Sequence, residues 1–350
     1  MSESRIRGTT GRRSFAVRIR GESRGTLAAT WGLVVKMFRG RPRAVQGREH
    51  LMATRKIPME PEAANTSGRS GPVTEIVNAF SVDVEEYFHD ETFRQLITQD
   101  QWDDLDQRVE PSTTRILELL DEFGVKGTFF VLGWVAERHP DLVRDIHNLG
   151  HEVGIHGYDH RPITVLTRDE FRRDIRKAKT IVEDLISDPI LGYRAPTFSL
   201  VEKTKWAFEI LIEEGIRYDS SVFPIVHDRY GIPTADRYPY VEQVGDRQLL
   251  EFPMSTIRLA GRNLPFVGGG YTRLLPMPLV RWGMRSGVGR EKRPMILYVH
   301  PWEVDPGHPV LGVGRVGRTR HYHGLAKVEP RLRELLGSFR FGTVREVLGI

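Results

Sequence analysis

Short apolar runs and helix-spaced apolar stripes alternate along the middle of the chain. The apolar runs predict buried strands, and they lie at residues 76–84, 127–132, 152–156, 189–193 and 216–219. The stripes predict helices that begin at Ser112, Trp134, Thr167 (with a capping box to Glu170) and Val201. Four consecutive strand–helix units with short turns are typical of parallel strands joined by helical crossovers. The pattern therefore predicts an α/β sheet or barrel.

This regularity weakens after residue 225, where prolines and glycines become dense. The elements predicted there are short strands at 249–252 and 295–299 and helices around 276–285 and 326–336. No internal repeat is evident in the chain.

The first 70 or so residues lack sustained periodicity and are rich in Arg, Gly, Ser and Thr, which predicts a mostly disordered extension. Residues 25–36 are moderately apolar, but a long basic region precedes them and no small-x-small cleavage site follows, which argues against a signal peptide. Two other interpretations are a basic surface-binding arm and sequence upstream of a true start at Met52 or Met59. The second is favoured.

Charge separates this extension from the rest of the chain. Residues 1–58 carry 14 Lys/Arg and 3 Asp/Glu, whereas residues 59–350 carry 37 and 43. Because the larger part is mildly acidic, the net charge of +5 gives no reason to expect nucleic-acid binding. Cysteine is absent, which excludes disulfides, thiolate ligands and cysteine nucleophiles. No run of about 18 apolar residues predicts a membrane span.

Two histidines and two acids follow predicted strands and suggest a metal centre. His156 and His160 come directly after one strand, while Asp83 and Glu85 lie two residues apart at the end of another and so face the same side. Two imidazoles and a carboxylate are a common ligand set in mononuclear metal hydrolases, and a second acid can act as base. Taken alone, each pair could equally be a solvated loop or strand end.

Four more residues offer chemistry near other predicted strand ends. Arg194 can hold a catalytic carboxylate by a bidentate pair, and Asp219 is either a partner of the site or a helix N-cap. His300 has no ligand-spaced companion, which suits a general acid better than a metal ligand. Trp302 offers a flat face for a sugar ring, although packing in the core is the commoner role.

Four other catalytic or nucleotide-binding motifs are rejected or absent. His151-Glu152 fails as a zincin motif, because the next histidine is five positions on instead of four. The glycines at 312, 314 and 317 have dinucleotide-binding spacing but follow no long strand and precede no apolar helix. The chain also has neither a P-loop nor a G-x-S-x-G elbow.

Taken in order, the blocks at 80–88, 156–160, 194–199 and 300–303 resemble the polysaccharide deacetylases of carbohydrate esterase family four, the nodulation-type chitooligosaccharide deacetylase domain. The resemblance covers roughly residues 76–300. The sequences of the first and third blocks resemble those of the subgroup found in exosortase (PEP-CTERM) exopolysaccharide loci. The region after residue 225 resembles that subgroup's C-terminal extension.

This resemblance implies a distorted (β/α) barrel of about seven parallel strands with an irregular C-terminal extension. It divides the chain into a basic extension at 1–70, a barrel at 71–300 and an extension at 301–350 packed on the barrel. The implied activity is metal-dependent removal of N-acetyl groups from amino sugars of a polysaccharide, an exopolysaccharide or its precursor, with release of acetate. The implied partners are that glycan and the exopolysaccharide assembly machinery. Because the sequence shows no convincing signal peptide, we expect a cytoplasmic location near the membrane.

The resemblance also implies a role for each site residue. Asp83 would be the base, Arg194 would orient it, His300 would protonate the leaving amine, and Asp219 would support them. A divalent metal, usually zinc, would be held by Glu85, His156 and His160, and the substrate would contact Trp302 and Phe198. The family usually has Asp-Asp in the first block, but Val84 takes the second place here, so Glu85 is the predicted substitute. Thr197 and Phe198 likewise replace the family's usual Tyr after Arg-x-Pro.

Two other functions stay open at this point. Related barrels open cyclic amides or act on formamides, and a substrate screen would separate them from a deacetylase. The chain could instead be a glycan-binding protein that has lost catalysis, with Val84 as the sign of that loss. Glycan binding without stoichiometric metal would favour this alternative.

Overall fold

The computed structural model describes residues 55–56 and 76–350, and the fold is presented for these residues. The predicted disordered extension, the apolar segment 25–36 and the two candidate starts lie outside the described residues. No helix in the described part of the chain is long and apolar enough to cross a membrane.

Seven parallel strands form the centre of the fold, in the order β11, β2, β3, β4, β5, β6, β8. In chain order they are β2 (Asn78–Val84), β3 (Thr128–Val131), β4 (Glu152–Ile155), β5 (Gly192–Tyr193), β6 (Tyr218–Asp219), β8 (Arg247–Glu251) and β11 (Ile296–Val299). The predicted α/β class and strand number are confirmed. No strand pairing closes the sheet between β8 and β11 within the described residues. A single hydrogen bond reaches across near that gap, from Ile296 N–H to Ser255 Oγ at 2.7 Å.

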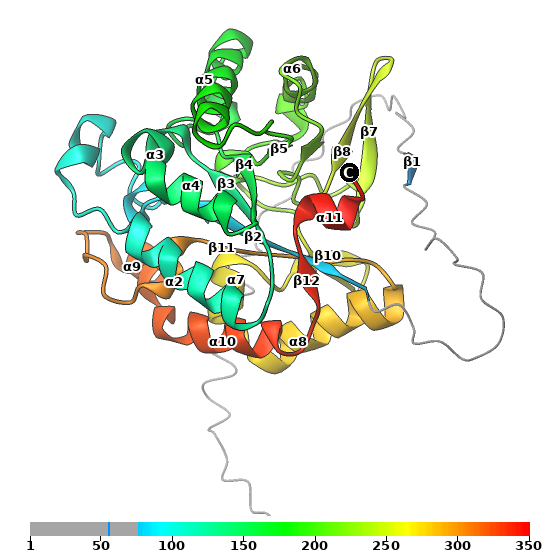
Figure 1. The fold of residues 1–350 in the computed structure, drawn as a ribbon. Coiled ribbons are helices and arrows are strands. Elements are labelled where there is room, and N and C mark those ends of the chain that lie inside the picture. The colour runs from blue at the N-terminus through cyan, green and yellow to red at the C-terminus, as the bar shows by residue number, and fades with distance from the viewer. Residues whose placement is uncertain (1–54, 57–75) are drawn as a thin grey trace, which may run out of the picture. The chain divides into compact units, whose positions relative to one another are not determined.

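Helices connect the first five strands and pack around the outside of the sheet (Figure 1). They are α2 (Val109–Glu122), α3 (Gly133–Arg138), α4 (Pro140–Asn148), α5 (Arg168–Ile186) and α6 (Ala207–Glu213). The capping box at Thr167 is present and begins α5 as predicted. The helix predicted from Trp134 is two helices, because Pro140 lacks the N–H that would continue α3 and instead begins α4.

Helix α2 begins at Val109, three residues before the predicted start at Ser112. The reason is a cap supplied from elsewhere in the chain. The carboxylate of Glu86 accepts hydrogen bonds from the backbone N–H groups of Arg108 (2.8 Å) and Val109 (2.9 Å). Pro111 is tolerated because first-turn N–H groups have no partner within the helix.

The region after residue 220 is more regular than its sequence predicted. It adds β7 (Tyr240–Val244), the hairpin of β9 (Thr256–Leu259) and β10 (Arg262–Pro265), and β12 (Phe341–Gly342), and β7 also pairs with β1 (Arg55–Lys56). The two helices predicted in this region are confirmed as α8 (Met277–Arg285) and α10 (Val328–Leu336), and the structure adds α7 (Gly269–Leu274), α9 (Arg315–Tyr322) and α11 (Val344–Leu348). Most of these elements are four to nine residues long, too short for their periodicity to stand out in the sequence.

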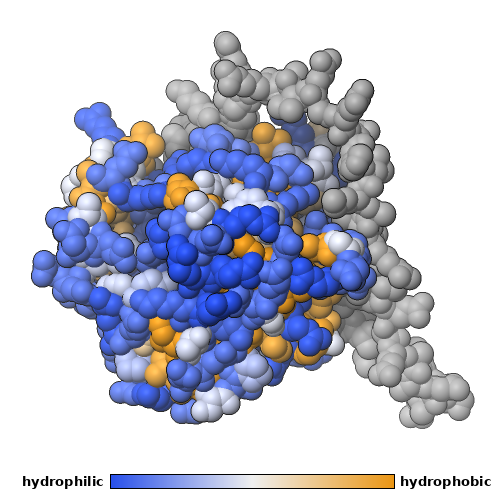
Figure 2. All heavy atoms as spheres, turned by 90° about the horizontal axis from the view of Figure 1, so that it is seen from above, coloured by the Kyte–Doolittle hydropathy of each residue, from blue (hydrophilic) through white to orange (hydrophobic). Residues whose placement is uncertain are grey.

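Burial on both faces explains why the central strands read as continuous apolar runs. All seven residues of β2 and all four of β3 and β11 are buried, as expected for parallel strands covered by helices. The outer surface differs: the face in Figure 2 is mainly hydrophilic, with only small scattered hydrophobic groups. Polar residues buried inside the sheet are therefore exceptions that need a reason.

Candidate metal centre

Four parallel strands end at one edge of the sheet, and each is followed by a residue predicted to belong to the site. Glu85 follows β2, His156 follows β4, Arg194 follows β5 and His300 follows β11. Because parallel strands bring their carboxyl ends to one side, these residues converge although they are far apart in sequence. A cavity of about 330 Å³ lies there and is lined by Glu85, His156 and His300, among others.

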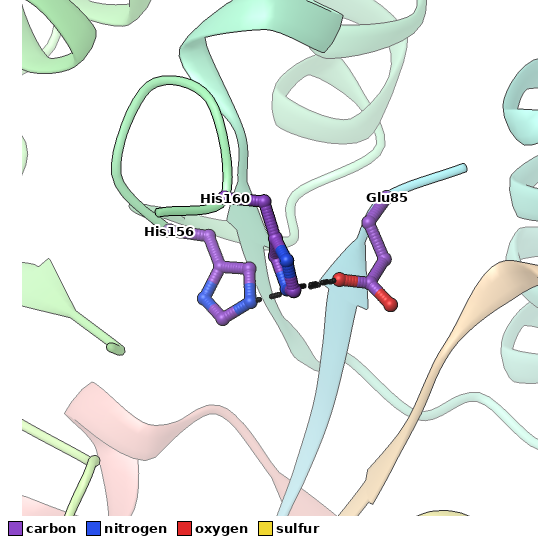
Figure 3. A group of neighbouring side chains, drawn as sticks. All are labelled: Glu85, His156 and His160. Carbon is purple, nitrogen blue, oxygen red and sulfur yellow. Dashed lines mark ion pairs between the residues drawn. The ribbon is translucent and has the colours of Figure 1, made fainter. Parts of the chain in front are cut away.

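Glu85, His156 and His160 form the part of this cavity that can hold a metal ion. One ligand atom from each residue lies within 4.8 Å of the other two, and all three residues are buried (Figure 3). Glu85 Oε2 is 2.8 Å from His160 Nε2 and 3.9 Å from His156 Nε2. Two imidazoles and one carboxylate with room for further ligands match a catalytic zinc site.

The carboxylate of Glu85 supports this assignment. Its Oε2 atom is buried and makes no hydrogen bond of acceptable geometry within the described residues, despite its short distance to His160. A buried carboxylate oxygen without a hydrogen bond is costly, and a cation at this point would satisfy it. The residues present therefore fit a divalent metal.

His156 is held in the form that a metal requires. Its Nδ1–H donates to the carbonyl oxygen of Arg194 at 2.8 Å, which leaves Nε2 as the unprotonated atom that faces Glu85. Burial and the neighbouring His160 lower the pKa of His156 to about 3, so the imidazole is neutral at physiological pH. A neutral imidazole is the form that binds a metal.

His160 reaches the site from a strained loop. Its backbone lies in the left-handed region with φ of +57°, and Gly157 before it has φ of +76°. A Cβ on Gly157 would also approach Asp174 Oδ2 to 2.9 Å, so this turn requires glycine. Burial would lower the pKa of His160, but the carboxylate of Glu85 outweighs it and raises the pKa. The same contact lowers the pKa of Glu85, against its own burial.

Asp83 lies beside this group and is oriented by Arg194. Arg194 Nη1 donates to Asp83 Oδ1 at 2.7 Å, and the arginine is fully buried. Its other donors bind Ser81 Oγ and both the carbonyl and hydroxyl oxygens of Ser220. Every side of the guanidinium is therefore engaged, which fixes the position of the Asp83 carboxylate.

His300 faces both acids from the opposite side of the cavity. Its Nε2 is 3.8 Å from Asp83 Oδ2 and 3.9 Å from Glu85 Oε1, and its Nδ1–H donates to Glu303 Oε2 at 3.0 Å. Burial would lower the pKa of His300, but the carboxylates around it, Glu85 first, raise the pKa to about 9. The ring is therefore protonated near neutral pH and can donate a proton.

Glu303 and Arg273 support His300, and sequence reasoning gave neither a role. Arg273 Nε donates to Glu303 Oε1 at 2.7 Å, and both side chains are almost fully buried. The only signal for Glu303 was its place three residues after His300. Arg273 gave none, because it lies on α7, 30 residues before Glu303.

Trp302 does not offer the sugar-binding face that the sequence suggested. It is 2% exposed and is absent from the described cavity lining. Its ring stacks on His300 (centroids 5.0 Å apart) and on His321 (4.2 Å), and its Nε1–H donates to Glu85 Oε1 at 3.1 Å. The structure therefore makes it a positioning residue for the carboxylate at the metal site.

Phe198 and Asp219 occupy different places. Phe198 lines the cavity, with φ of +51° that follows φ of +54° at Thr197. Asp219 is fully buried away from the cavity, where it accepts hydrogen bonds from Ser221 N–H (3.1 Å) and Oγ–H (2.5 Å). Burial raises the pKa of Asp219 and of Glu251 beside it. Asp219 therefore shapes the turn whose Ser220 holds Arg194 and does not reach a substrate.

Two family models match separate parts of the chain. Residues 98–211 match the model described as "Polysaccharide deacetylase", and residues 220–349 match one described as "Domain of unknown function (DUF3473)". The first match contains His156, His160 and Arg194, and the second contains His300. Asp83 and Glu85 precede both matches.

Curated relatives are similar to part of the chain. A peptidoglycan-N-acetylglucosamine deacetylase of Bacillus cereus is 38% identical over 98 residues, which are 28% of this chain and 36% of that protein. A peptidoglycan deacetylase of Helicobacter pylori is 29% identical over 137 residues, 39% of this chain and 42% of that protein. The matched part thus spans less than half the length of either relative.

A solved structure extends the likeness of the fold. The structure, described as that of a candidate polysaccharide deacetylase from Mycobacterium smegmatis, has a TM-score of 0.52 and 24% sequence identity, and the match covers 80% of this chain and 91% of that chain. At this identity the match shows a shared fold. Residues 98–211 are therefore similar in sequence to polysaccharide deacetylases, and most of the chain shares the fold of this solved structure.

Proposed function

We propose that the protein is a metal-dependent hydrolase that removes N-acetyl groups from the amino sugars of a polysaccharide and releases acetate. One observation carries the proposal. The metal-binding group of Glu85, His156 and His160 shares its cavity with an oriented acid, Asp83, and a protonated imidazole, His300. Metal-dependent hydrolysis of an amide uses these three functions around one substrate.

Glu85, His156 and His160 would hold a divalent ion, and zinc suits this ligand set. The bound ion would supply Lewis-acid chemistry at the acetamide carbonyl. Asp83 accepts a proton from the attacking water, and Arg194 keeps its carboxylate aimed into the cavity. The water oxygen bonds to the carbonyl carbon. As the carbon–nitrogen bond breaks, His300 donates a proton to the nitrogen, which leaves acetate and a free amine.

The position of Val84 supports an intact enzyme over one that has lost catalysis. Val84 is fully buried in β2, while Glu85, one residue later, places its carboxylate beside both histidines. The metal-binding group thus has an oxygen ligand without an acid at residue 84.

Two conservative variants test the division of roles between the acids. Asp83→Asn should keep stoichiometric zinc and lose acetate release from an N-acetylated oligosaccharide, whereas Glu85→Gln should lose zinc as well. Metal content of the purified variants and acetate release decide the matter. Zinc bound normally by Glu85→Gln, or full turnover by Asp83→Asn, would contradict the proposal.

The finer expectations remain predictions. They are zinc as the physiological metal, an exopolysaccharide or its precursor as substrate, association with the assembly machinery, and a cytoplasmic location near the membrane. Metal analysis of protein from its native cells, acetylation analysis of the exopolysaccharide from a deletion strain, and cell fractionation address these points in turn. Acetate release in preference to the opening of cyclic amides separates the proposed activity from that of related hydrolases.

A further inference from the structure

Some of the charged residues that line the cavity have an ion-pair partner, and others have none. All four carboxylates have a partner: Asp83 pairs with Arg194 (2.7 Å), Glu85 with His160 (2.8 Å), Asp90 with His321 (3.4 Å) and Glu91 with Arg94 (3.6 Å). Two further arginines, Arg229 and Arg320, also line the cavity. Neither forms an ion pair with any of the residues that the structure describes. Arg229 and Arg320 therefore leave two cationic side chains without an ion-pair partner at the cavity wall, among the residues described.

Arg320 is held in place by the residues that support His300. It lies near the end of α9, and its carbonyl oxygen accepts a hydrogen bond from Arg273 Nη2 at 3.1 Å. The same guanidinium donates to His321 O at 2.6 Å and to Glu303. The backbone of Arg320 thus has a fixed position relative to the predicted general acid.

Arg229 reaches the same wall from the loop after β6. Its backbone N–H donates to His227 Nδ1 at 3.2 Å, and the His227 ring stacks on Tyr230 with centroids 3.8 Å apart. Tyr230 itself lines the cavity. Both Arg229 and Arg320 act to lower the pKa of His227 and that of Tyr230, so the two guanidinium groups lie in one neighbourhood.

We propose that Arg229 and Arg320 form an anion subsite at the wall of the cavity, and that the substrate is an acidic glycan. The subsite would bind an oxyanion, the carboxylate of a hexuronate or a phosphate, carried near the N-acetylated sugar. Guanidinium groups suit this role because they bind carboxylate and phosphate through paired hydrogen bonds. The inference rests on the proposed deacetylase function, since it names the substrate class of the same site.

The test compares neutral and acidic glycans that share the N-acetylated sugar. Acetate release is measured on chitotetraose, on a tetrasaccharide of alternating N-acetylglucosamine and glucuronate, and on UDP-N-acetylglucosamine, with the zinc-loaded full chain. The variants are Arg229→Gln, Arg320→Gln and the double variant. Arg318→Gln is the matched control, because Arg318 is an exposed arginine of α9 outside the cavity lining.

The wild type should prefer one of the two acidic substrates. A preference for the glucuronate tetrasaccharide indicates a subsite for a carboxylate, and a preference for UDP-N-acetylglucosamine indicates a subsite for a phosphate. Each single variant should raise KM for that substrate about tenfold, and the double variant about a hundredfold, with kcat nearly unchanged. KM for chitotetraose should change less than about twofold, and Arg318→Gln should behave as the wild type. A wild type that prefers chitotetraose, or a double variant that lowers activity equally on all three glycans, would overturn the proposal.

A binding measurement keeps this inference separate from the activity itself. The Asp83→Asn variant, with and without the two arginine substitutions, is titrated calorimetrically with chitotetraose and the glucuronate tetrasaccharide, and with UDP-N-acetylglucosamine. Tighter binding of an acidic ligand that disappears with the arginines supports the subsite even if no acetate is released, in which case only the proposed function fails. Equal affinities for neutral and acidic ligands refute the subsite whatever the activity.

Discussion

Residues 76–219 and residues 220–350 contribute to the same cavity in different ways. The first region delivers its groups directly from strand ends, as with Glu85 after β2 and His156 after β4. The second delivers His300 in the same manner but surrounds it with Glu303, Trp302 and Arg273, which act through other side chains. In the proposed function, the first region therefore supplies the metal ligands and the base. The second controls protonation, the position of Glu85 and, as proposed, the charge of the substrate.

The largest expected effect lies in the first region. His156→Ala removes one of the three proposed ligands, so zinc content should fall to background and acetate release by at least about 1000-fold. Metal analysis and a turnover assay measure both. His147→Ala, on α4 and outside the cavity lining, should keep metal and activity. Normal turnover by His156→Ala would break the assignment of the first region.

A second effect appears in stability. Arg194→Ala leaves the Asp83 carboxylate buried without its partner, so the free energy of unfolding should fall by about 3–5 kcal/mol. Urea denaturation followed by circular dichroism measures the change. Arg172→Ala breaks partly exposed pairs with Glu213 and Glu214 and should cost less than about 1 kcal/mol. Equal costs would mean that the Asp83–Arg194 pair is not a structural element of the site.

A third prediction concerns the hydrogen bond by which the second region contacts the proposed metal ligand Glu85 of the first. Trp302→Phe keeps an aromatic ring but removes the N–H that binds Glu85, so zinc affinity should fall about 10- to 100-fold. At saturating zinc, kcat should return close to the wild-type value. Competition with a chelator gives the affinity, and Trp282→Phe, which is 44% exposed, is the control. Unchanged affinity would separate Trp302 from the metal site.

The smallest effect concerns a histidine of the first region that is structural. His151 Nδ1 accepts a hydrogen bond from Gly127 N–H at 3.1 Å, and burial lowers the pKa of His151 to about 4. The unfolded chain binds a proton at His151 more readily than the folded chain does. The stability that neutral His151 contributes is therefore lost as pH falls from about 6.5 through about 4. The loss should be about 1 kcal/mol at about pH 5.5.

His151→Asn should remove that part of the pH dependence and leave zinc content unchanged. Urea denaturation at about pH 7.5 and about pH 5.5 measures the difference between variant and wild type. An unchanged pH dependence would show that His151 does not titrate between the folded and unfolded states.

Sequence reasoning reached the first region because its chemistry is local. His156 and His160 follow an apolar strand and Asp83 and Glu85 end another, so strand prediction alone placed them at one edge of the sheet. The hydrogen bond from Trp302 to Glu85 joins residues 217 positions apart, and no sequence pattern near either residue predicts it. A flat, amphipathic side chain such as Trp suits a sugar platform and a buried donor equally well. Only its burial decides between them.

The same limit applies to the fold. The Thr167 capping box is local and was predicted correctly, whereas the start of α2 depends on Glu86, 22 residues before Arg108. Strands β5 and β6 have two residues each and were predicted as longer runs, because apolar sequence continues beyond the part that pairs. Pairing partners, and not apolar character alone, set where such strands begin and end.

The place of β8 and β11 in the sheet bears on how such proteins can be recombined. These two strands lie at the two ends of the parallel part of the sheet, where β8 pairs with β6 and β11 pairs with β2, yet both belong to the part matched by the domain of unknown function. A chain shortened to the deacetylase match would keep only β3, β4 and β5 of the parallel strands, would leave β3 and β5 with unpaired edges, and would lose Glu85 and His300. The boundary between the two sequence families therefore runs through one folding unit. Chimeras between relatives should exchange residues 220–350 as a block, together with the strands that receive them.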